Sequence, residues 1–142
     1  MYNVLLAVDA DETRAERSAN AIVDLPADPS SIDVVLLNVF KEFEVTDGEG
    51  RVDSSELYDE GAFPDSVTKA TEILDAAGID ATKRREHGNP AELILEVAEE
   101  IDANLVAVGG RKRSPTGKVI FGSVTLSVLQ EADTPVLVTM SE

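Results

Sequence analysis

The residues of this chain that are best suited to bind an anion lie between positions 106 and 124, in the stretch VAVGGRKRSPTGKVIFGSV. An apolar run ends at Gly109 and Gly110, and Gly122-Ser123 follows where a helical pattern begins. Four cations lie in between, at Arg111, Lys112, Arg113 and Lys118. Glycines let the backbone approach a ligand closely, and a helix N-terminus offers N–H donors to an anion. The stretch therefore predicts a phosphate-binding loop. The alternative is a solvated loop whose cations offset nearby acidic residues.

This loop does not match two familiar phosphate-binding motifs. Gly117-Lys118 is followed by Val119, where a P-loop requires Ser or Thr, and position 112 is Lys, where a P-loop requires Gly. No G-x-G-x-x-G pattern follows the first predicted strand. The sequence therefore argues against a P-loop NTPase and against a Rossmann dehydrogenase.

Candidate catalytic groups are few. His87 is the only histidine, so it has no second histidine with which to build a metal site, and a structural or exposed role in a loop is favoured. The serines at 114, 123 and 127 lack the context of a nucleophile elbow, and no acid/base pair stands out among the carboxylates. We therefore predict no catalytic residue and no metal site formed by side chains.

The composition is strongly acidic. The 142 residues contain 12 Lys and Arg against 28 Asp and Glu, a net charge of −16, so we expect no nucleic acid and no membrane as partners. There is no cysteine, no signal sequence and no apolar run of the roughly 20 residues that span a bilayer, which favours a cytoplasmic location. Few lysines among many acids are typical of proteins from salt-loving cells, where salt screens self-repulsion.

Apolar patterning predicts a single domain, 1–142, in which strands and helices alternate. The expected strands are 3–8, 32–40, 79–86, 105–108 and 136–139. Continuous apolar strands are typical of a parallel sheet that is covered by helices on both faces. The fold class is therefore α/β, an open and doubly wound parallel sheet. Residues 41–63 contain eight acids and three glycines, which predicts a mobile acidic loop, more plausibly a solvated spacer than a partner-binding arm.

Helix boundaries are marked by residues with known capping preferences. Thr13 and Glu16 form a capping box for the first helix, and Pro64 suits the first turn of the second. Gly78 suits the position just after the second helix, and Asn89 is a good N-cap for the third. The fourth helix is expected at 123–132.

In open parallel sheets, ligands bind beyond the C-terminal ends of the strands, where the strand order reverses. Asp9 follows the first strand and Gly109 ends the fourth, so Asp9 faces the glycine loop if these strands are neighbours. The Asp9 carboxylate could accept hydrogen bonds from a ribose or a base, or it could cap the following turn. Ser123 could bind a phosphate oxygen or cap its helix, and Lys112 and Arg113 could neutralise a di- or triphosphate.

Several segments, taken together, resemble the universal stress protein family over nearly the whole chain. They are VLLAVD at 4–9, VVLLNV at 34–39, HGNPAE at 87–92, the glycine loop with the GSVT that follows it, and TPVLV at 134–138. The resemblance implies five parallel strands in the order 3-2-1-4-5. It also implies a homodimer, often formed through the last strand.

One branch of this family binds ATP, together with a divalent metal such as Mg²⁺ or Mn²⁺, through the motif G-x2-G-x9-G-[S/T]. Gly109, Gly122 and Ser123 match this motif, and Lys112 replaces its second glycine. Lysine at this position either blocks the close approach of the phosphates or contacts them through its charge. The resemblance further implies contacts to the adenine and ribose from Ala7, Asp9 and Val39, and to a phosphate from the N–H of Val124.

The sequence thus predicts a cytoplasmic homodimer that binds an adenine nucleotide, ATP, in stress response or signalling. We expect little or no hydrolysis, because no residue is obviously placed to activate water. One alternative is a nucleotide-free interaction module of the same family, in which Lys112 closes the site. Another is an anion sensor that takes phosphate, or a nucleotide other than ATP, at the basic loop, and a phosphotransferase is the least favoured.

Overall fold

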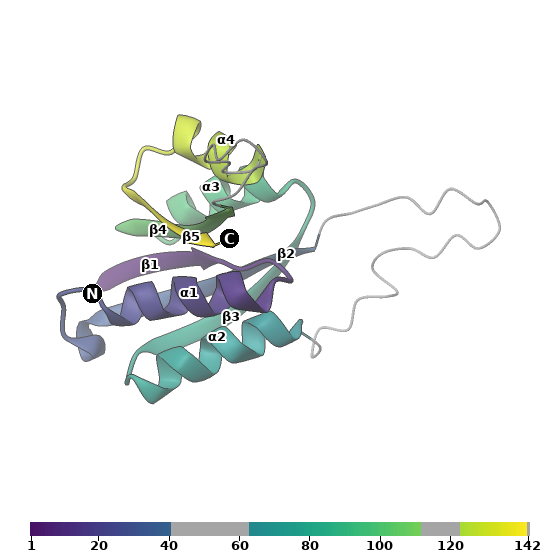
Figure 1. Cartoon of the computed structure of the whole chain (residues 1–142). Helices are drawn as coiled ribbons and strands as arrows, with labels where there is room; N and C mark the ends of the chain where they lie inside the picture. The colour runs from purple at the N-terminus through teal and green to yellow at the C-terminus, as the bar shows by residue number, and fades with distance from the viewer. Residues whose placement is uncertain (41–62, 112–122, 142) are drawn as a thin grey trace.

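The structure, a computed structural model, describes residues 1–40, 63–111 and 123–141, in which five strands alternate with four helices (Figure 1). In chain order the elements are β1 (Tyr2–Ala7), α1 (Glu12–Val23), a short 3-10 helix (Pro29–Ser31), β2 (Ile32–Phe40), α2 (Asp65–Ala76), β3 (Asp80–His87), α3 (Pro90–Glu100), β4 (Leu105–Arg111), α4 (Ser123–Glu131) and β5 (Val136–Ser141). The predicted acidic loop lies outside the described residues except for its last residue, Phe63.

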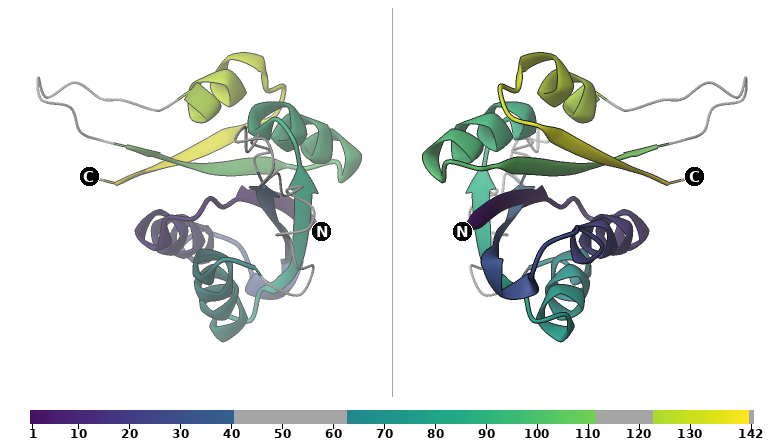
Figure 2. Two further views of the ribbon diagram at one scale, coloured as in Figure 1. Left: turned by 90° about the vertical axis from the view of Figure 1, so that its right-hand side faces the viewer. Right: turned by 90° about the vertical axis from the view of Figure 1, so that its left-hand side faces the viewer.

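The five strands form one parallel sheet in the order β3-β2-β1-β4-β5, which confirms the predicted fold class and strand order. Helices α1 and α2 cover one face of the sheet, and α3 and α4 cover the other (Figures 1 and 2). Strands β2 and β3 are added in turn on one side of β1. The chain then crosses over the sheet, and β4 and β5 are added on the other side of β1. The strand order therefore reverses between β1 and β4.

The alternation of side chains along each strand divides the core into two layers. Val4 and Leu6 of β1 pack with α1 and α2, whereas Leu5 packs with α3 and α4. In β4, Ala107 belongs to the first layer and Val106 to the second. Both faces of the central strands are thus apolar, which is why these strands appear in the sequence as continuous hydrophobic runs.

Helices α2 and α3 end in the same motif but with different residues. At the end of α2, Gly78 has φ +82° and the N–H of Ile79 donates to the carbonyl of Leu74 at 3.0 Å. At the end of α3, Asp102 has φ +53° and the N–H of Ala103 donates to the carbonyl of Ala98 at 2.9 Å. This is the Schellman arrangement, which favours glycine at the residue with positive φ. The prediction for Gly78 is confirmed.

Replacing Asp102 with glycine is expected to stabilise the protein by about 0.5–1 kcal/mol, because glycine adopts positive φ without a steric penalty. The change also removes a negative charge from a helix C-terminus, where the helix dipole disfavours it. The reciprocal variant Gly78→Asp should lose a similar amount. Urea unfolding of both variants measures the two changes, and a less stable Asp102→Gly protein would contradict this explanation.

Two predicted helix starts are wrong by one or two residues. Helix α1 begins at Glu12 and its N-cap is Asp11, whose Oδ1 accepts a hydrogen bond from the N–H of Arg14 at 2.9 Å, so Thr13 lies inside the first turn. Asp is a stronger N-cap than Thr, and it takes the position two residues earlier. Pro64 is the N-cap of α2 rather than its first residue. The predicted cap of α3 is confirmed, since Asn89 Oδ1 accepts from the N–H of Glu92 at 3.1 Å.

Strand β4 continues through the two glycines at which a break was predicted. Gly109 and Gly110 pair with Thr139 and Met140 of β5, so their backbone groups remain in the sheet. A Cβ atom on Gly110 would lie 3.1 Å from Met140 Sδ. Glycine at 110 therefore lets β4 pack closely against side chains of its neighbour, which is a structural role that the sequence pattern did not indicate.

Strand β3 forms one edge of the sheet, as its mixed charge predicted, and it includes His87, which had been expected in a loop. Arg84 Nε donates to Glu86 at 2.8 Å, and its guanidinium also pairs with Glu100 at the end of α3. The hydrogen bond from Arg84 holds the pKa of Glu100 below its ordinary value. These ion pairs join the edge strand to the helix that follows it.

Across the described part of the chain, no helix combines the length and hydropathy that a bilayer crossing requires.

Candidate functional site

A cavity of about 270 Å³ lies at the C-terminal ends of β1 and β4, where the strand order reverses. Its lining comes from three strands and three helices. The residues are Ala7, Val8, Asp9, Arg14, Ala15, Ser18, Leu37, Val39, Pro90, Ile94, Val108, Gly109, Val124 and Thr125. This is the place at which doubly wound sheets bind ligands.

Most of the cavity wall is apolar. Leu37 and Val39 of β2 and Ala7 of β1 form much of the wall contributed by the sheet, and Ile94 of α3 and Val124 of α4 lie over them. All five belong to the core layer between the sheet and α3/α4 or pack against it. A slot of this kind suits a flat, weakly polar group such as a nucleobase.

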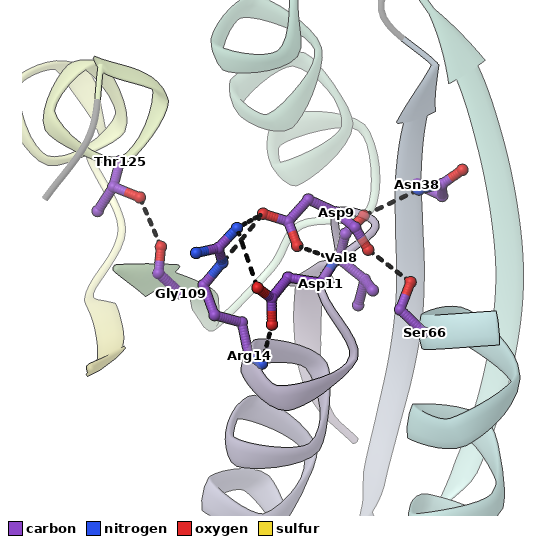
Figure 3. A network of polar contacts seen from close by, with 8 residues as sticks. All are labelled: Val8, Asp9, Asp11, Arg14, Asn38, Ser66, Gly109 and Thr125. Carbon is purple, nitrogen blue, oxygen red and sulfur yellow. Dashed lines mark hydrogen bonds and ion pairs between the residues drawn. The ribbon is translucent and has the colours of Figure 1, made fainter. Parts of the chain in front are cut away.

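The polar end of the cavity is formed by Asp9 and Arg14. Arg14 Nε and Nη2 both donate to Asp9 Oδ2, at 3.1 and 2.9 Å, and the N–H of Asp11 donates to Asp9 Oδ1 at 2.9 Å (Figure 3). The Arg14 side chain is 17% exposed and that of Asp9 is 57% exposed. The carboxylate therefore lies at the mouth of the cavity, and the arginine lies beneath it.

The turn that carries Asp9 is held by side chains from β2 and α2. Asn38 Nδ2 donates to the carbonyl of Val8 at 2.9 Å, and Ser66 Oγ donates to the carbonyl of Asp9 at 2.5 Å (Figure 3). Asn38 and Ser66 are themselves buried. Because these bonds hold consecutive carbonyls, they fix the backbone from which the Asp9 side chain extends.

Asn38→Ala is expected to lower the free energy of unfolding by about 1–3 kcal/mol, because the buried carbonyl of Val8 would lose its side-chain donor. Asn20 on α1 is exposed and provides a matched control, for which Asn20→Ala should change stability by no more than about 0.5 kcal/mol. Urea unfolding compares the two variants. Equal effects would show that Asn38 does not have this role.

The β4 side of the cavity is tied to α4 and β5 in a similar way. Thr125 Oγ1 donates to the carbonyl of Gly109 at 2.7 Å. Ser18 Oγ and Thr139 Oγ1 lie 2.7 Å apart, which joins α1 to β5 on the other face of the sheet. Gly109 is thus held by α4, and a Cβ atom at this position would lie 3.3 Å from Arg14 Cδ.

Five of the predicted site residues line this one cavity. They are Ala7, Asp9, Val39, Gly109 and Val124. Ser123 is the first residue of α4, next to Val124. Lys112, Arg113 and Gly122 lie outside the described residues.

Sequence reasoning missed Arg14, Asn38, Ser66 and Thr125. A signal for Arg14 was available: the helix after a parallel strand starts at the same edge of the sheet as the strand's end. Side chains of the first turn of α1 therefore lie near Asp9. The other three are polar residues on otherwise apolar strand or helix faces, where a buried polar group needs a partner.

A second cavity, of about 480 Å³, lies at the opposite end of β4. Its lining includes Glu99, Asp102, Glu131 and Asp133, so it would repel an anionic ligand. Among the described residues, no group of three or more His, Cys, Asp and Glu side chains is arranged to hold a metal ion. The cavity at the strand-order reversal is therefore the candidate site, although it is the smaller of the two.

The fold and the site together define a doubly wound α/β protein with a cavity where the strand order reverses, between β1 and β4. The family model described as "Universal stress protein family" matches residues 1–139. The chain belongs to this family.

Individual relatives agree with this assignment. A universal stress protein from Mycolicibacterium smegmatis is 34% identical over 97 residues, which cover 65% of this chain and 68% of that protein. The structure of a universal stress protein from Archaeoglobus fulgidus is 27% identical and superposes with a TM-score of 0.75, covering 97% of this chain and 98% of that one. A structure of the universal stress protein from Archaeoglobus fulgidus in complex with dAMP, 21% identical with a TM-score of 0.68 and 97% coverage of each chain, shares the fold.

Proposed function

We propose that the protein binds an adenine nucleotide in the cavity between β1 and β4 and acts in signalling or stress response without turning the nucleotide over. The observation that carries this proposal is an apolar slot that ends at the carboxylate of Asp9, at the ligand-binding edge of a doubly wound sheet. The relative solved with dAMP supports the choice of adenine.

In this proposal the nucleobase lies against Ala7, Val39 and Val124, and Asp9 accepts a hydrogen bond from the ribose. The phosphates extend toward Gly109 and the N-terminus of α4, where a helix offers N–H donors to an anion. The basic residues Lys112 and Arg113 and the motif residues Gly122 and Ser123 are proposed to contact the phosphates. We propose ATP with Mg²⁺ or Mn²⁺ as the physiological ligand and a homodimer in the cytoplasm as the working form.

Calorimetric titration tests this function. Adenosine, AMP and ATP are titrated into the purified protein in high salt, and ATP is titrated with and without Mg²⁺ or Mn²⁺. GMP is the control, since a site for adenine should discriminate against guanine. Saturable binding of one adenine nucleotide per chain is expected, with no release of phosphate from ATP during the measurement. A folded protein that binds none of these ligands would overturn the proposal in favour of a nucleotide-free interaction module.

A further inference from the structure

We propose that Arg14 binds a phosphate of the nucleotide, so that the site holds its anion with a guanidinium from α1. This inference rests on the proposed adenine-nucleotide function and names a residue that the glycine-rich motif does not contain. It is carried by the position of the side chain, its hydrogen bonds and the charges around it.

Arg14 lies within the cavity rather than on the surface of α1. Its side chain is 17% exposed, and its aliphatic part packs against Gly109, where a Cβ atom would lie 3.3, 3.5 and 3.6 Å from Arg14 Cδ, Cβ and Cγ. The guanidinium therefore lies between the end of β1 and the end of β4, with Asp9 on one side and Gly109 on the other (Figure 3). A ligand that crosses from one strand end to the other must pass next to it.

The hydrogen bonds of Arg14 leave donors available for a ligand. Nε and Nη2 donate to Asp9 Oδ2, and Nη2 lies 3.7 Å from Asp11 Oδ2. Within residues 1–40, 63–111 and 123–141, Nη1 donates no hydrogen bond to another residue. A guanidinium has five N–H donors in a fixed plane, and a carboxylate on one edge orients the remaining donors. Asp9 thus acts as a positioning residue for Arg14.

Arg14 also provides the positive charge at this end of the cavity. Among the described residues that line it, Arg14 is the one cation, and the nearby acids are Asp9, Asp11 and Glu12. The ion pair with Arg14 offsets the charge of Asp9, one of these three acids, and leaves Arg14 as the described group in this lining whose N–H donors can attract a phosphate. Arginine also suits phosphate better than lysine does, because two of its N–H groups can contact two oxygens at once.

The test compares AMP with adenosine, which differ by the phosphate alone. Arg14→Gln should weaken AMP binding by about 10- to 100-fold, which is the loss of affinity expected when a hydrogen bond to a charged group is removed. It should change adenosine binding by less than about twofold. Added KCl should weaken AMP binding less steeply in the variant than in the wild type. Arg17→Gln is the matched control, because Arg17 lies on the same helix, is exposed and contacts the carbonyl of Met140 at 3.4 Å. It should bind both ligands as the wild type does.

Other outcomes overturn the inference. Equal losses for AMP and adenosine would mean that Arg14 serves only to position Asp9, and tighter AMP binding would mean that Arg14 occupies the space of the ligand. If Arg14→Gln does not fold, Arg14→Lys replaces it: it keeps the charge without the planar fork, so an intermediate loss for AMP alone is expected, and unchanged AMP affinity would count against the inference.

A second measurement separates this inference from the proposed function. If the wild type binds none of adenosine, AMP and ATP, the proposed function fails. The ¹⁵N–¹H signal of Arg14 Nε is then followed while inorganic phosphate is added to the wild-type protein. A saturable shift of that signal, with none at Arg17, would support phosphate binding by Arg14 without a nucleotide. No shift would overturn the inference as well.

Discussion

Replacing Ala7 with leucine is expected to weaken binding of both adenosine and AMP by about 5- to 150-fold, which corresponds to a steric cost of about 1–3 kcal/mol. Ala7 is the last residue of β1, packs against the core layer under α3 and α4, and lines the candidate site. Leucine adds three carbon atoms to that wall, in the space proposed for the nucleobase. Calorimetric titration of each ligand measures the loss.

Ala103→Leu provides the matched control for this prediction. Ala103 packs against the same core layer but lines the acidic cavity at the opposite end of β4. The same change in side-chain volume should therefore leave nucleotide affinity unaltered. Thermal unfolding shows whether either variant is misfolded. If Ala7→Leu binds as tightly as the wild type while Arg14→Gln does not, the nucleobase lies elsewhere and the phosphate alone is held at this end of the sheet.

Replacing Leu6 with alanine is expected to produce the largest loss of stability, about 2–5 kcal/mol out of a total of about 5–15 kcal/mol for a domain of this kind. Leu6 is completely buried and lies on the central strand, in register with Leu36 of β2 and Ala107 of β4. Alanine removes contacts from the layer that α1 and α2 share. The midpoint of urea unfolding should fall by about 1 M or more, with an unchanged slope.

Leu126→Ala makes the same chemical change on the surface. Leu126 on α4 is 46% exposed, so its replacement should alter the stability of the monomer by no more than about 0.5 kcal/mol. A loss at Leu126 as large as that at Leu6 would show that α4 is covered in solution, as it would be in an assembly. Repeating the unfolding at several protein concentrations would then reveal the subunit interface.

The fold could be predicted well because both periodicity and chain order are local signals. Runs such as 3–8 and 32–40 are apolar on both faces, and between successive strands the pattern changes to a helical one with recognisable caps such as Asn89 before α3. The strand order was predicted from the resemblance to a family, because no local sequence pattern indicates that β4 pairs with β1 on the side opposite β2. The errors lie at element ends, where Asp11 competed with Thr13 and where pairing with β5 extended β4 through two glycines.

The site could be predicted only in part, for a different physical reason. Ala7, Asp9, Val39, Gly109 and Val124 occupy the ends of strands or the start of a helix, so topology alone brings them together. The partnership of Arg14 with Asp9 depends on a side-chain conformation, and the roles of Asn38 and Ser66 depend on which backbone carbonyls are left without a partner. Sequence spacing does not encode these contacts.

The narrow contact between β1 and β4 has a consequence for the lifetime of the native state. These strands pair at only three positions, 4–6 with 105–107, and the cavity beyond them is lined by α1 and β2 on one side and by α3, β4 and α4 on the other. A molecule held there touches both halves of the chain and opposes their separation. At one hundred times its dissociation constant it would add about 2.7 kcal/mol to the free energy of unfolding. The supply of ligand would then set how often the sheet opens at its centre, and with it the rate at which proteases degrade the protein.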